Sequence, residues 1–195
     1  MFNLASGKIV LFFQDGNLQS GIITGIENTH YKVQNLQGET YILSPARFIL
    51  VSQNVYEPLS IKTLKDFEDK IRTKIEERDE NWLQRLQKTQ ASFTFEEASS
   101  KLDCKNDLES FALFILLQQR KDLIKFKKGV FSFRNEEERL QYLKAELEAK
   151  ERLAYLNEVE RFLQANQDLL LSVDSSSSLD ISISLATEFK TGFLS

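Results

Sequence analysis

The chain has 195 residues, of which 42% are hydrophobic and 11% aromatic, and its formal net charge is −4. This content is enough for the core of one large or two small domains, whereas the negative charge argues against nonspecific nucleic-acid binding by the whole chain. The single cysteine, Cys104, excludes an internal disulfide framework, and no N-terminal stretch resembles a signal peptide or a membrane span. These features predict a cytoplasmic protein with no membrane partner.

Residues 1–56 predict a small β domain. Five short runs rich in apolar residues are separated by turn-forming Gly, Asn, Asp and Pro, and the runs are "KIVLFF", "LQSGIITGIE", "HYKVQ", "ETYILS" and "FILV". Strands of this length and spacing favour a small SH3-like β-barrel, closed on itself to hide its edges.

Residues 57–168 predict a helical domain. After Pro58 the apolar period changes to 3.6, which predicts one helix, or two meeting near Asp79, with a stripe formed by Leu64, Phe67, Ile71, Ile75, Trp82 and Leu86. Thr94 and Glu97 match a capping box that opens a short helix through Leu102. A second helix follows over residues 107–121.

The stretch "LIKFKKGVFSFRNEEE", residues 123–138, predicts a β-hairpin followed by a helix. With Lys128 and Gly129 as central turn residues, Phe126 lies opposite Phe131 and Ile124 opposite Phe133, all on one face. The other face carries Lys125, Lys127, Val130, Ser132 and Arg134. Two helices and then a hairpin is the order of a winged helix, so the predicted fold class is α+β, with residues 123–134 as the wing.

A long helix and a tail complete the chain. Asn135 and Glu138 match a second capping box, at the head of a helix that extends to residue 167. Residues 169–195 predict a flexible tail, because four consecutive serines precede "DISISL", which alternates like an isolated strand.

Positive charge is concentrated around the predicted wing. Between residues 120 and 134 there are six basic residues and one acidic residue. They are either solvated edge residues that discourage aggregation or a surface that contacts phosphates. The candidate RNA-binding residues are Arg120, Lys121, Lys125, Lys127, Lys128 and Arg134.

Sequence-specific DNA reading and catalysis find little support. The helical stretch "FALFILL", residues 111–117, is apolar around its whole circumference, so it should be buried rather than present polar side chains to base edges. The single histidine, His30, and Cys104 have no partners in sequence for a nucleophile pair or a metal site. No catalytic residue, metal or cofactor is predicted.

The order of small barrel, charged helix, winged helix and long charged helix resembles the N-terminal region of one branch of the ribonuclease II/R family, the RNB-type exoribonucleases. The matching stretches, within residues 7–165, are "GKIVLFFQDGNLQSGIITGIENTHYKVQNLQGETYILSPARF" and "FTFEEASSKLDCKNDLESFALFILLQQRKDLIKFKKGVFSFRNEEERLQYL". The resemblance implies 3′-to-5′ RNA cleavage by aspartates that hold magnesium in a large catalytic domain, which these residues lack. Asp174 and Asp180 have the family's first spacing, but apolar residues and serine follow, so we expect no RNA cleavage by this chain.

Three functions follow, in decreasing order. The first is a non-catalytic RNA-engaging or scaffold region whose partner is single-stranded RNA, bound weakly and nonspecifically, or a catalytic RNB subunit or domain. The second is a protein-interaction module that uses helix 111–117 and the long helix 135–167. The third is a winged-helix DNA-binding regulator.

Overall fold

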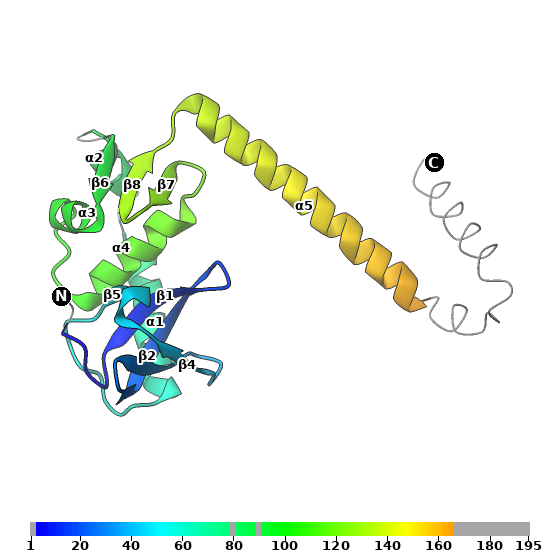
Figure 1. Ribbon diagram of the computed structural model, residues 1–195. Coiled ribbons are helices and arrows are strands. Elements are labelled where there is room, and N and C mark those ends of the chain that lie inside the picture. Colours follow the sequence, from blue (N-terminus) through cyan, green and yellow to red (C-terminus); the bar gives the residue numbers. More distant parts are fainter. Residues whose placement is uncertain (1–2, 79–80, 89–90, 166–195) are drawn as a thin grey trace, which may run out of the picture. The chain divides into compact units, whose positions relative to one another are not determined.

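The computed structural model describes residues 3–78, 81–88 and 91–165. The chain divides into two compact units, Met1–Arg139 and Leu140–Ser195. The chain combines antiparallel sheets, formed by runs of consecutive strands, with helices, which agrees with the predicted α+β class (Figure 1). The predicted tail, residues 169–195, lies outside the described residues.

The five predicted strands are present and form one antiparallel sheet in the order β4-β3-β2-β1-β5. Their bounds are β1 (Ile9–Gln14), β2 (Asn17–Glu27), β3 (His30–Gln34), β4 (Thr40–Leu43) and β5 (Phe48–Val51). The expected closure into a barrel is wrong for the described residues, because β4 and β5 are opposite edges that do not pair with each other. Helices cover one face of the sheet, so this face is buried without closure.

The predicted apolar stripe is divided between α1 (Ile61–Glu76) and α2 (Trp82–Gln87). Five of its six side chains are buried and Ile75 packs against them. The Oγ of Ser60 accepts a hydrogen bond from the backbone N–H of Thr63 and so caps α1. The remaining helices are α3 (Phe95–Lys101), α4 (Asp107–Gln119) and α5 (Glu136–Ala165), and the 3₁₀ turn η1 (Pro45–Arg47) precedes β5.

The main core of the first unit joins the sheet to the helices. Ile9 and Leu11 of β1 pack in one cluster with Leu64 of α1 and Phe111 of α4. Because successive strand residues face opposite sides, Val10 and Phe12 belong to a second cluster on the other face. The boundary expected between residues 56 and 57 therefore lies inside the first unit, and the core extends across it.

A buried carboxylate fixes α4 to the segment that follows β5. Asp107 is 4% exposed and accepts hydrogen bonds from Gln53 N (2.5 Å), Asn54 N (3.0 Å), Asn54 Nδ2 (2.8 Å) and the Tyr56 hydroxyl (2.9 Å). Burial, together with the neighbouring Asp107 carboxylate, raises the pKa of Tyr56. Lys8, also buried, donates to the carbonyl oxygens of residues 52 and 53. Opposite buried charges thus hold the same segment of backbone.

Candidate nucleic-acid interface

The hairpin has the predicted register. Its strands are β7 (Ile124–Lys127) and β8 (Val130–Phe133), with Phe126 opposite Phe131 and Ile124 opposite Phe133. Lys128 and Gly129 have φ values of 51° and 82°, as a two-residue turn with both central residues in the left-handed region requires. A third strand, β6 (Ser92–Thr94), was not predicted and pairs with β8, giving the order β6-β8-β7.

Aromatic side chains anchor the apolar face of the hairpin on α4. The ring centroids of Phe126 and Phe131 are 4.5 Å apart, and Phe114 of α4 meets them edge-on at 5.8 and 5.7 Å. Phe93 of β6 stacks on Phe131 at 5.7 Å. Figure 1 shows α4 between the two sheets. The hairpin is therefore held on a packed core, with its charged face turned away from these rings.

Burial of the apolar helix is confirmed. Residues 111–114 and 117 of α4 are buried, and residues 115 and 116 are half-buried. The main partner of α4 is α1, where Phe67 meets Phe111 edge-on at 5.2 Å. The side chains of residues 111–117 are therefore largely taken up by packing within the first unit.

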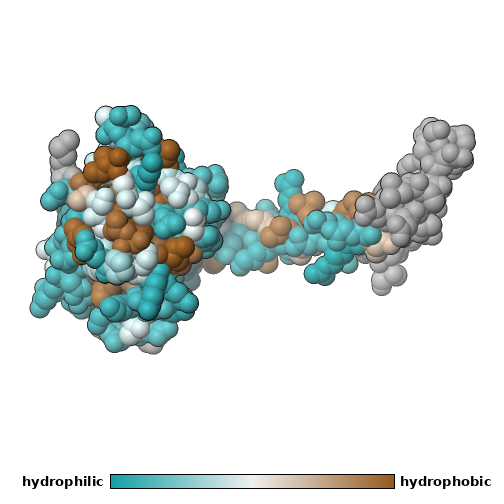
Figure 2. Space-filling model, turned by 90° about the horizontal axis from the view of Figure 1, so that it is seen from below, coloured by the Kyte–Doolittle hydropathy of each residue, from teal (hydrophilic) through white to brown (hydrophobic). Residues whose placement is uncertain are grey.

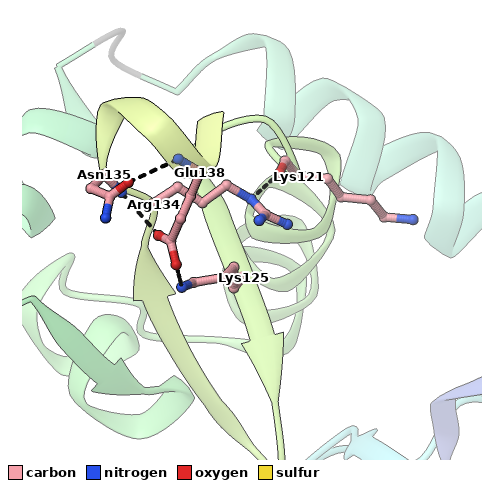
Figure 3. Close-up of polar contacts among 5 residues, drawn as sticks. All are labelled: Lys121, Lys125, Arg134, Asn135 and Glu138. Atoms are coloured by element: carbon pink, nitrogen blue, oxygen red, sulfur yellow. Dashed lines mark hydrogen bonds and ion pairs between the residues drawn. The ribbon is translucent and has the colours of Figure 1, made fainter. Parts of the chain in front are cut away.

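Lys125 forms an ion pair with the first turn of α5. Its Nζ lies 2.5 Å from Oε1 of Glu138, while Oε2 of Glu138 accepts from the backbone N–H of Asn135 at 3.1 Å. Oδ1 of Asn135 accepts in turn from the Glu138 N–H at 2.8 Å, which confirms the second capping box (Figure 3). The Lys125 hydrogen bond, followed by that from Asn135, lowers the pKa of Glu138.

Two other candidate residues are also engaged within the chain. Arg120 donates from Nε and from Nη2 to the two oxygens of Asp122, at 3.1 and 3.2 Å, and this contact lowers the pKa of Asp122. Nε of Arg134 donates to the carbonyl oxygen of Lys121 at 2.9 Å. Both guanidinium groups are thus oriented by the protein itself.

Lys121, Lys127 and Lys128 remain as exposed cations. Within the part of the chain that the structure describes, none of the three forms an ion pair. Figure 3 shows the Lys121 side chain extending away from the Lys125–Glu138 pair. The candidate interface therefore consists of two ammonium groups near the hairpin turn and a third at the base of the hairpin.

Comparison with known proteins adds no family. No protein-family model matches the chain, and no curated protein matches it. Across the described ranges, no group of three or more His, Cys, Asp or Glu side chains is placed to hold a metal ion. No helix in those ranges is long and apolar enough to cross a bilayer. The resemblance to RNB-type exoribonucleases stays a prediction that rests on the order of the modules.

Proposed function

We propose that this chain is a non-catalytic RNA-engaging region, similar in role to the N-terminal part of RNB-type exoribonucleases. The observation that supports it is the set of three exposed lysines, with Lys127 and Lys128 at the turn of the hairpin and Lys121 at its base, on a hairpin anchored by aromatic contacts with α4. Ammonium groups on a preorganised edge contact phosphates without reading bases. Binding should be weak and nearly independent of RNA sequence.

We also infer the finer fold identities. In the five-stranded sheet, the short η1 turn leads β5 back to pair with β1, which supports an SH3-like arrangement. The order α2, β6, α3, α4, β7 and β8 supports a winged helix whose first strand, β6, completes a three-stranded sheet.

The number of unpaired cations sets the expected salt dependence. Each phosphate neutralised on a single strand contributes about 0.7 to the slope of log affinity against log salt, so three contacts predict a slope of about 2. The ion pairs of Arg120 and Lys125 keep these two side chains out of the count while they remain intact. A slope of this size corresponds to a weak contact that would assist a neighbouring catalytic domain or subunit, rather than to a tight binding site.

A second candidate function rests on α5. Its described part exposes about half or more of the side chains of Leu140, Leu147, Leu153 and Leu156. Figure 2 shows that hydrophobic side chains on the drawn face of the first unit form separate groups among polar ones. Protein docking, in this second reading, would therefore use α5 rather than the drawn face of the first unit.

The test is fluorescence anisotropy of the full chain with end-labelled single-stranded RNA at several salt concentrations. We expect binding at low salt, a slope of about 2 and little change between RNA sequences. The RNA should keep its length in the presence of magnesium. A protein that does not bind at low salt, or one that shortens RNA in a chelator-sensitive manner, would contradict the proposal.

A further inference from the structure

The first unit contains a cavity of about 470 Å³ where the β1–β2 hairpin meets the last turns of α1 and α4. Its apolar walls include Leu11, Phe13, Leu18, Ile71, Ile75 and Ile115. Small-molecule sites are of this size, with mostly apolar walls and a few polar groups that fix the ligand. Two of its lining residues have features that point to the chemistry of a ligand.

The first is the ring of Phe13. Strand alternation places Phe13 on the same face of β1 as Ile9 and Leu11, but it is only half-buried and belongs to neither core cluster. The other phenylalanines described in the first unit all have an aromatic neighbour, whereas Phe13 has none among the described residues. An unpartnered ring in a cavity offers a face on which another flat group can stack.

The second is the side-chain amide of Gln118 on α4. Its Nε2 is buried and has no hydrogen-bond partner, although buried donors are nearly always satisfied. The atom is shielded from solvent, so the Gln118 side chain has to turn toward the cavity for a ligand acceptor to reach it. That hydrogen bond would remove the penalty, and an aliphatic side chain would not.

The lining of the cavity carries both signs of charge. Arg72 and Lys121 supply cations, and Lys121 is also part of the candidate interface at the hairpin. Glu68, which accepts a hydrogen bond from the Ser20 hydroxyl, and Glu76 supply carboxylates. The carboxylates disfavour a phosphate inside the cavity but suit a ligand with amino groups. The two cations suit a phosphate at the mouth of the cavity.

We propose that this cavity receives one unstacked nucleobase of a bound single strand, and this rests on the proposed function. The base stacks on Phe13, and a ring nitrogen or carbonyl oxygen accepts the Gln118 N–H. Its 5′ or 3′ phosphate lies at the mouth of the cavity, near Lys121 or Arg72. Adenine and cytosine, which carry exocyclic amino groups, suit the carboxylates of Glu68 and Glu76 better than uracil does.

The test uses the full ¹⁵N-labelled chain and uncharged nucleosides, at about 0.5 M salt so that phosphate-type contacts are screened. We expect adenosine or cytidine to shift the Gln118 side-chain amide resonances in a saturable manner. Phe13→Ala should weaken binding about fivefold or more, since a stacked aromatic is lost. Gln118→Met should weaken it too without lowering protein stability, because it removes an unsatisfied donor.

Two outcomes would overturn the inference. In the first, neither the nucleosides nor N-acetyl-leucinamide shift the Gln118 amide resonances. In the second, only N-acetyl-leucinamide shifts them, which would assign the cavity to a peptide side chain. Failure of the proposed function gives a different result, namely no salt-dependent binding of RNA to the full chain. The nucleoside titration at high salt is a separate experiment, so its result stands whether or not the full chain binds RNA.

Discussion

The Nζ of Lys125 and the Oε1 of Glu138 lie 2.5 Å apart, so a lysine on the charged face of the hairpin is neutralised by the first turn of the next helix. Glu138 also completes the capping box with Asn135. One carboxylate therefore both begins α5 and reduces the positive charge of the candidate interface. The charge of Glu138 therefore decides whether Lys125 is available for the proposed RNA contact.

Glu138→Gln should strengthen RNA binding. Gln at this position keeps the capping box, while loss of the carboxylate charge releases Lys125 for a phosphate. We expect the salt slope measured by anisotropy to rise by about 0.7. The matched control is Glu136→Gln, which removes the same charge from an exposed residue in the same turn. Equal slopes for the two variants would show that Lys125 takes no part.

Acid should remove the contribution of Glu138 to stability. Its pKa in the folded chain is below the ordinary value of 4.5, so the contribution is present above that value and is lost as pH falls through the lower folded value. The difference in unfolding free energy between the parent and Glu138→Gln should be constant near neutral pH and shrink below pH 4.5. Urea unfolding at several pH values measures it, and a difference independent of pH would contradict this account.

Asp107→Ala should be strongly destabilising. It leaves buried donors from residues 53, 54 and 56 without an acceptor. We expect a loss of about 3 kcal/mol or more in urea unfolding. Asp103→Asn, which removes the charge of an exposed pair with Lys105 and suits the left-handed backbone of residue 103 (φ 54°), should change stability by less than about 1 kcal/mol. Similar losses for the two variants would rule out the buried carboxylate as the link between α4 and the segment after β5.

Leu11→Ala should destabilise the sheet and the helices together. Leu11 is 1% exposed in the shared core, and its truncation should cost about 2–5 kcal/mol. The single tryptophan, Trp82, lies in α2, so its fluorescence follows the helical part. The Trp82 transition should move to lower urea, as the circular dichroism transition does. A Trp82 transition that stays in place would instead support separate units on either side of residue 56.

Local patterns predicted most of the elements, because turns, periodicity and capping boxes depend on residues close in sequence. The hairpin register, the α1–α2 stripe and both boxes are examples. Strand β6 was missed because three residues are too few for a period to show. The role of Asp107 depends on partners 51 to 54 positions away, which no local pattern contains. The predicted barrel closure was wrong because α1 and α4 cover one face of the sheet, and this packing also joins residues that are far apart in sequence.

From the sequence, the candidate site was predicted only as a local excess of basic residues. The structure changes which of those residues belong to it. Asp122 and Glu138 were both visible in the sequence, but only the folded hairpin brings them to Arg120 and Lys125. Two of the six candidate cations are in ion pairs and Arg134 donates to a backbone carbonyl, which leaves three exposed lysines.

The most direct test of the central claim is the salt dependence of RNA binding by Lys127→Gln/Lys128→Asn, compared with Lys62→Gln/Lys65→Gln. Asn suits the left-handed turn position of Lys128, so the hairpin should persist, and the control removes the same charge from exposed sites on α1. We expect the slope of log affinity against log salt to fall by about 1.4 in the hairpin variant and to stay at the parent value in the control. Equal slopes for the two variants would contradict an RNA-binding hairpin and give the lead to protein docking through α5.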